Sequence, residues 1–210
     1  MDINAHTQFC GVIGNPVEHS LSPAIHNAAF QKLGLNFVYL AFRVEAIGDA
    51  IRGLRALGNF RGASVTIPHK VAAVPFLDAV EPTASHIGAI NTIVAEGGTL
   101  TGYNTDAIGA LRALHEGGVA LKGNQVVMLG SGGAARAIAF ALGTEAGVGR
   151  LTILGIDSQE RAALTRDLQS KTGMAVQESH LEEGTLRQIL PDAHVLIHCT
   201  PMGMSPKVDE

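Results

Sequence analysis

A glycine-rich run lies between a segment with strand character and one with helix character. Residues 125–129 are apolar and favour a buried parallel strand, and the alanine-rich residues 134–142 favour a helix. Between them stand Gly130, Ser131, Gly132, Gly133, Ala134 and Ala135. In this pattern the first glycine allows a tight turn, the second admits a pyrophosphate, and the small residue at 135 brings helix close to strand. The run therefore predicts a nucleotide site, with a tight turn that binds no ligand as the alternative.

Composition limits the class of protein. The chain has 210 residues, of which 46% are apolar and 16% charged, as expected for a globular α/β protein that buries a core. Its net charge of −4 and the absence of a basic block disfavour nucleic acid as a partner. Cys10 and Cys199 form no disulfide or zinc pattern, none of the histidines has metal-ligand spacing, and we expect no metal. Without a leader pattern or a membrane-length apolar run, the expected location is the cytoplasm.

Strand and helix patterns alternate along the chain. In the first half we expect strands at residues 9–13, 37–42, 63–67, 91–95 and 100–103, and helices at 23–33, 46–57, 71–79 and 106–115. The last two strands form a hairpin, which we expect to close the edge of the sheet. In the second half we expect strands at 125–129, 151–156, 175–177 and 195–197, and helices at 134–142, 160–169 and 186–190. Gly117-Gly118 marks a boundary, so we predict domains at 1–117 and 118–210, the second doubly wound.

Four polar clusters precede the glycine run. They are Ser20-Leu21-Ser22-Pro23, Ser64-Val65-Thr66-Ile67-Pro68-His69-Lys70, Gly88-Ala89-Ile90-Asn91-Thr92 and Gly102-Tyr103-Asn104-Thr105-Asp106. In this order, and ahead of the glycine run, they resemble the shikimate dehydrogenase family over nearly the whole chain. The resemblance implies an α/β substrate domain followed by a Rossmann-like NAD(P)-binding domain with a cleft between them, in an enzyme of aromatic amino acid and chorismate biosynthesis. It also implies a shikimate-type cyclic hydroxy acid as substrate, and a homodimer is possible.

The same resemblance assigns roles to particular residues. Lys70 and Asp106 would form the acid–base pair, because oxidation of a secondary alcohol needs a group that takes the hydroxyl proton and returns it in the reverse direction. Ser20 and Ser22 would bind the substrate carboxylate, although Ser22 before a proline is also a typical N-cap. The remaining contacts implied are Thr66 and Asn91 to the ring hydroxyls and Thr200 and Met202 beside the nicotinamide.

The choice between NAD and NADP depends on residues 155–157. Family members that use NADP tend to have Asn-Arg-Thr there, whereas this chain has Gly155-Ile156-Asp157. Asp157 would accept a hydrogen bond from a free ribose hydroxyl and repel a phosphate, which favours NAD. Two alternatives stay open: Ser158 and Arg161 recruit a phosphate, or Asp157 only caps the following helix.

Other functions remain as alternatives. Quinate or aminoshikimate could be the substrate, and two intact serines favour shikimate over quinate. A metabolite or nucleotide sensor would keep the fold, but it would not need a proton shuttle such as Lys70 with Asp106. A dehydrogenase for an unrelated substrate would use Ser20 and Ser22 only as helix caps. Because the family continues beyond the point that corresponds to Glu210, we also expect the natural polypeptide to be longer.

Overall fold

The computed structural model describes residues 3–204, and the chain divides into two compact units, residues 1–104 and 105–210. The sequence analysis put the boundary near Gly117. The difference lies in helix α5 (Asp106–Glu116), which packs on α6 (Gly133–Thr144) and so belongs to the second unit. The Gly117-Gly118 turn ends α5 and is therefore internal to that unit.

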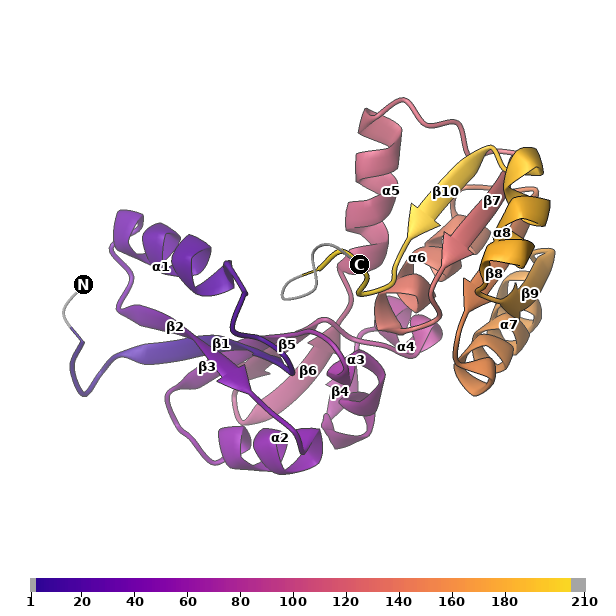
Figure 1. Cartoon of the computed structure of the whole chain (residues 1–210). Coiled ribbons are helices and arrows are strands. Elements are labelled where there is room, and N and C mark those ends of the chain that lie inside the picture. Colours follow the sequence, from indigo (N-terminus) through magenta and orange to yellow (C-terminus); the bar gives the residue numbers. More distant parts are fainter. Residues whose placement is uncertain (1–2, 205–210) are drawn as a thin grey trace. The chain divides into compact units, whose positions relative to one another are not determined.

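The first unit is built on a mixed sheet of six strands in the order β2-β1-β3-β5-β6-β4 (Figure 1). Its strands are β1 (Gln8–Gly14), β2 (Phe37–Arg43), β3 (Phe60–Val65), β4 (Ala79–Val80), β5 (Thr92–Glu96) and β6 (Thr99–Tyr103). Strand β1 is parallel to β2 and β3, while β5 is antiparallel to β3 and β6. The β5–β6 hairpin does not close the sheet as expected, because β4 pairs with β6 and forms that edge.

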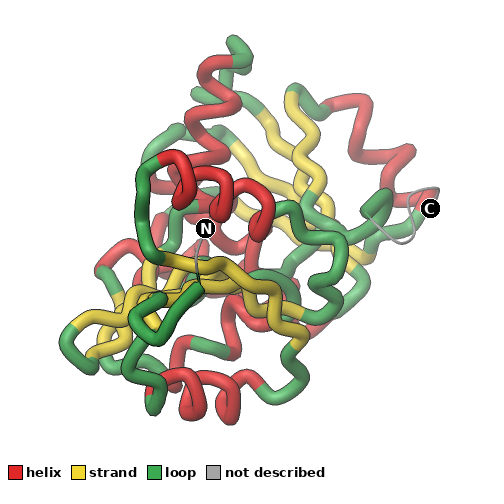
Figure 2. The backbone as a smooth tube through the Cα atoms, turned by 90° about the vertical axis from the view of Figure 1, so that its left-hand side faces the viewer, coloured by secondary structure: helices red, strands yellow, loops and turns green. Residues whose placement is uncertain are grey.

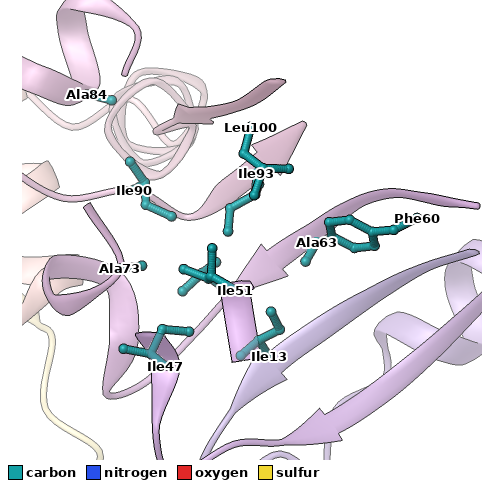
Figure 3. Packing of buried hydrophobic residues seen from close by; sticks show 11 residues of the cluster. Ile13, Ile47, Ile51, Phe60, Ala63, Ala73, Ala84, Ile90, Ile93 and Leu100 are labelled. Atoms are coloured by element: carbon teal, nitrogen blue, oxygen red, sulfur yellow. The ribbon is translucent and has the colours of Figure 1, made fainter. Parts of the chain in front are cut away.

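Helices cover both faces of this sheet. Helix α1 (Ser22–Lys32) packs on the face that carries Val12 and Tyr39, where Phe30 meets them. The other face carries the main core, to which α2 (Ile47–Arg55) contributes Ile47 and Ile51 (Figure 3). Two short helices, α3 (His69–Ala72) and α4 (Pro82–Ile87), and a 3₁₀ turn (Val74–Phe76) complete the unit. The sequence analysis expected one helix over 71–79 and missed α4, whose six residues are too short to show a periodic pattern.

The second unit has a parallel sheet in the order β10-β7-β8-β9 (Figure 1). Figure 2 shows the strands of the chain in yellow and its helices in red. Its strands are β7 (Gln125–Leu129), β8 (Arg150–Gly155), β9 (Val176–His180) and β10 (Val195–His198). Besides α5 and α6, its helices are α7 (Ser158–Thr172), α8 (Glu183–Ile189) and a 3₁₀ turn (Leu190–Asp192). The chain runs outward from β7 to β9 and then returns to place β10 on the other side of β7. This is the strand order of a dinucleotide-binding half, with its switch point between β7 and β10.

The small residues of α6 explain how that helix fits its neighbours. Ala135, Ala137 and Ala139 are fully buried, together with the larger Phe140 and Leu142. Methyl side chains let α6 pack closely against α5 and α7, and the dinucleotide-binding pattern has a small residue at position 135 for close packing of helix and strand. The predicted α/β class with parallel strands is confirmed. No helix among residues 3–204 is both long and apolar enough to cross a bilayer.

Candidate active site

Thr66 and Lys70 lie on the turn that joins β3 to α3. The Thr66 amide donates to the Ile13 carbonyl at 2.9 Å, and the Thr66 carbonyl accepts from the His69 amide at 2.9 Å. A Cβ atom at Gly14 would collide with Cγ2 of Thr66, so the threonine side chain occupies space that only a glycine leaves. The end of β1 thus fixes where the Thr66 side chain lies.

The segment that carries Asn91 is fastened to the same turn. The Ile90 amide donates to the Lys70 carbonyl at 2.8 Å, and the Val65 amide donates to the Asn91 carbonyl at 2.7 Å. The hydroxyl of Thr92 donates to Oδ1 of Asn91 at 2.9 Å and orients its amide. The first unit therefore brings Asn91 to the same corner of its sheet as Thr66 and Lys70, which precede it by 25 and 21 residues.

His69 is a residue of this corner that the sequence analysis did not single out. Its ring is buried, with 4% exposed, and Nε2 lies 2.7 Å from the Val44 carbonyl. Val44 in turn donates its amide to the Gly14 carbonyl. His69 therefore anchors the helical turn that carries Lys70 to the end of β1. A histidine directly before the lysine was the available signal, but only the fold shows its partner.

The two serines come together at the start of α1. The Ser22 amide donates to Oγ of Ser20 at 3.3 Å, and Ser22 is the first residue of the helix, with Leu21 as N-cap. The alternative in which Ser22 is the N-cap is therefore wrong. Because Oγ of Ser20 accepts this bond, its hydroxyl proton is directed elsewhere.

Ser64 is held by a buried tyrosine from β2. The Tyr39 hydroxyl donates to Oγ of Ser64 at 2.7 Å, and the Tyr39 ring stacks on His26 with centroids 4.3 Å apart. Burial raises the pKa of Tyr39, and the hydrogen bond to Ser64 opposes part of that rise. In the register of the sheet Ser64 is opposite Val12, so both lie on the face that also carries Tyr39. A serine at this position is thus held in place by Tyr39.

Asp106 lies in the second unit, as the first residue of α5. The chain that leads to it is fixed by Asn104, which is buried and donates from Nδ2 to the Ala89 carbonyl at 2.9 Å. The pairing of Asp106 with Lys70 stays a prediction.

The glycine run forms the turn between β7 and α6. Gly130 has φ of +101°, and a Cβ there would lie 3.0 Å from the carbonyl carbon and oxygen of Cys199, so a side chain is excluded on two grounds. Gly132 is the N-cap of α6, and a Cβ there would enter open space. The helix start is therefore bare on the side where an anion could approach its amides, and the residues present fit a dinucleotide pyrophosphate.

The loop after β10 lies beside this turn. The Cys199 amide donates to the Leu129 carbonyl at 2.8 Å, which places the loop at the switch point. Oγ1 of Thr200 accepts from the Met202 amide at 3.2 Å and lies 3.3 Å from Nε2 of His198. The Met202 side chain is exposed. Thr200 and Met202 thus lie at the same edge of the sheet as the glycine run, as the predicted nicotinamide contacts require.

Asp157 is the N-cap of α7. Its Oδ1 accepts from the amides of Gln159 at 2.8 Å and Glu160 at 2.9 Å. The open alternative in which Asp157 caps the helix is therefore confirmed. Among residues 3–204, no three histidine, cysteine or acidic side chains gather in a way that could hold a metal ion.

Comparison with known proteins gives the family. Residues 12–93 match the model of the shikimate dehydrogenase substrate binding domain. The shikimate dehydrogenase (NADP(+)) of Moorella thermoacetica is 46% identical over 213 residues, covering 100% of this chain and 71% of that protein. A crystal structure of a shikimate dehydrogenase in complex with NADP+ has a TM-score of 0.85 at 40% identity, covering 100% of this chain and 72% of that one. The Listeria monocytogenes shikimate 5-dehydrogenase in complex with shikimate and NAD has a TM-score of 0.82 at 36% identity, with coverages of 100% and 74%.

The chain belongs to the shikimate dehydrogenase family. The family resemblance of the four polar clusters is thereby confirmed, as are the two-domain α/β fold and the class of NAD(P)-dependent oxidoreductase. The cofactor class of the family is a nicotinamide dinucleotide. The relatives' names favour NADP and give no support to the expectation of NAD. The roles of individual side chains in this member of the family stay predictions.

Proposed function

We propose that this chain interconverts shikimate and 3-dehydroshikimate with a nicotinamide dinucleotide. The observation that carries the proposal is the corner of the first unit where backbone hydrogen bonds hold Thr66, Lys70 and Asn91 together, in a chain that belongs to this family. When bound, the dinucleotide supplies the hydride acceptor or donor. The first unit would then be the substrate domain and the second the nucleotide domain.

Lys70 carries the proton in this proposal. In the direction of oxidation the uncharged amine takes the hydroxyl proton as the C–H bond loses hydride, and in reduction the ammonium returns that proton to the forming alkoxide. The Lys70 carbonyl is tied to Ile90 and the preceding His69 ring to Val44, so both sides of the lysine are held. Asp106 would hold the amine in place and accept from a ring hydroxyl.

The carboxylate of the substrate would be bound by Ser20 and Ser22. Two hydroxyl donors satisfy a carboxylate without a countercharge, and Oγ of Ser20 already accepts a bond, which leaves its proton for donation. Thr66 and Asn91 would bind ring hydroxyls. A site with several directed hydrogen bonds rejects analogues that lack a hydroxyl, because its own polar groups would be left unpaired.

The nucleotide would bind along the carboxyl edge of β7, β8 and β10. Gly130, Ser131, Gly132, Gly133 and Ala134 would surround the pyrophosphate, and Thr200 and Met202 would lie beside the nicotinamide. The names of relatives favour NADP, and solved relatives are in complex with either NADP+ or NAD. In this chain the residues that follow β8 determine the choice. A homodimer and a cytoplasmic location also remain proposals.

The test of this function is the initial rate of reduced dinucleotide formation with shikimate and, separately, with quinate. We expect turnover with shikimate to exceed that with quinate. Ser20→Ala should raise KM for shikimate with a smaller effect on kcat, while Ser85→Ala, an exposed serine on α4, serves as the matched control and should leave both unchanged. No turnover of either acid with NAD or NADP would contradict the proposal.

A further inference from the structure

The first turn of α7 carries two carboxylates, and the structure gives them different tasks. Asp157 is occupied as the N-cap, with Oδ1 accepting from two amides. Glu160 lies one turn further on, and its Oε2 accepts from Oγ of Ser131 in the glycine run at 3.3 Å. Glu160, which the sequence analysis did not consider, is thus the carboxylate that contacts the glycine run.

Arg161, the arginine that directly follows Glu160, binds protein groups through its guanidinium. Arg161 is 7% exposed, and its guanidinium donates through Nε to Glu178 and through Nη1 to the Gly155 carbonyl, each at 2.5 Å. The alternative in which Arg161 recruits a phosphate would require its buried guanidinium to leave both Glu178 and the Gly155 carbonyl, which would lose its partner. Arg161 therefore neutralises Glu178 and offers no charge to a ligand.

Gly155 and Arg161 fit together sterically. A Cβ at Gly155 would lie 3.1 Å from Oγ of Ser131 and 3.2 Å from Cγ of Arg161, so the arginine stem occupies the space that a larger residue would need. Ile156, the next residue, is 76% exposed, and its side chain has no polar group that could bind a phosphate. Residues 155–160 contain no lysine or arginine. The end of β8 thus presents an apolar side chain and two carboxylates.

We propose that this site selects NAD over NADP, and that Glu160 is the residue that excludes the 2′-phosphate. The inference rests on the proposed function only in that the second unit binds a nicotinamide dinucleotide. In dinucleotide folds the turn after the second strand meets the adenosine ribose, where a carboxylate accepts from the 2′-hydroxyl of NAD and an arginine accommodates the 2′-phosphate of NADP. A phosphate with nearly two negative charges beside Glu160 and Asp157 would be repelled, whereas a ribose hydroxyl can donate to Glu160.

Calorimetric titration of the whole chain with NAD+ and with NADP+ tests this without using catalysis. We expect NAD+ to bind at least about tenfold more tightly than NADP+, a ratio that corresponds to about 1.4 kcal/mol. Glu160→Gln keeps a hydrogen-bonding group near Ser131 and removes the charge. It should therefore lower the ratio of the NADP+ dissociation constant to the NAD+ dissociation constant, mainly by improving NADP+ binding. Glu183→Gln, a glutamate in the first turn of α8, is the matched control and should leave the ratio unchanged.

The outcomes separate this inference from the proposed function. Equal or tighter binding of NADP+ by the wild type would overturn the selection of NAD while leaving the dehydrogenase intact. An unchanged ratio in Glu160→Gln would overturn the role of Glu160. Binding of neither nucleotide would overturn the nucleotide role of the second unit and this inference with it.

Discussion

Among single residues, Gly130 and Gly132 should have different roles: Gly130 is needed for the fold, and Gly132 is needed for dinucleotide binding. Gly130 combines a positive φ with backbone contact to Cys199, so Gly130→Ala should destabilise the second unit by about 1–3 kcal/mol. Gly132 has φ of −71° and open space where a Cβ would be, so Gly132→Ala loses only the N-cap preference for glycine over alanine and should cost no more than about 1 kcal/mol. Thermal unfolding of the two variants measures this difference.

The same pair makes a prediction about the ligand. A methyl group on Gly132 would occupy the space in which the pyrophosphate is proposed to approach the helix amides. We therefore expect Gly132→Ala to weaken dinucleotide binding by roughly tenfold or more, which titration would measure. Unchanged affinity in a stably folded Gly132→Ala protein would place the pyrophosphate elsewhere.

Asp78 should make the stability of the first unit depend on pH. Its carboxylate accepts from the Leu100 amide at 2.8 Å and from Arg55 at 2.5 Å, and these bonds hold the pKa of Asp78 below its ordinary value. A lowered folded-state pKa stabilises the fold above the unfolded pKa of about 3.9, and this contribution is lost as pH falls through the folded value. Asp78→Asn should thus have a lower free energy of unfolding than wild type near neutral pH, and this difference in free energy should become smaller in acid.

Urea unfolding near neutral pH and at about pH 3 measures that difference. Asp49→Asn is a suitable control, because Asp49 is exposed and its ion pair is formed with Arg52 of the same helix. A difference of the same size at both pH values would show that the Asp78 carboxylate contributes nothing through its charge.

At the scale of elements, α2 is held to the sheet by a narrow apolar face. Ile51 is 1% exposed and lies within the main core (Figure 3). Arg52 on the same helix is exposed. Truncation of Ile51 leaves a cavity that a packed core fills only in part, so Ile51→Ala should cost about 2–5 kcal/mol. Arg52→Ala should stay within about 1 kcal/mol, because exposed ion pairs contribute little.

Hydrogen exchange in the two α2 variants would test this at the level of elements. We expect Ile51→Ala to lower protection across β1, β3 and β5 and Arg52→Ala to leave it unchanged. Equal protection in the two variants would contradict the assignment of α2 to the core.

The elements differ in how far the sequence predicts them. Strands β1, β2 and β7 and helices α1 and α6 are long enough to be recognised in the sequence, and they agree with the expectation within two residues at each end. Strand β4 and helix α4 are too short to show a period, and β4 exists only because β6 offers it an edge. Partners distant in sequence, such as Tyr39 with Ser64 or Ser131 with Glu160, depend on strand order and were not predicted.

At the scale of the whole molecule, the order of motifs along the chain carried more information than any single motif. Polar clusters at the ends of β3 and β6, followed by a glycine run after β7, indicated the family, and the comparisons confirmed it. The boundary between the units was harder to predict, because α5 follows the first unit's last strand directly and only its packing on α6 assigns it.

Lys70 is proposed to transfer the proton when this chain oxidises shikimate. The most direct measurement is the rate of shikimate oxidation by wild type, Lys70→Ala and the control Lys32→Ala, an exposed lysine on α1, with shikimate binding titrated in each. We predict that Lys70→Ala loses about a hundredfold to ten-thousandfold in kcat while still binding shikimate, and that Lys32→Ala matches wild type. Turnover by Lys70→Ala at the wild-type rate, or binding without turnover by the wild type, would contradict the claim, and the second result would indicate a sensor.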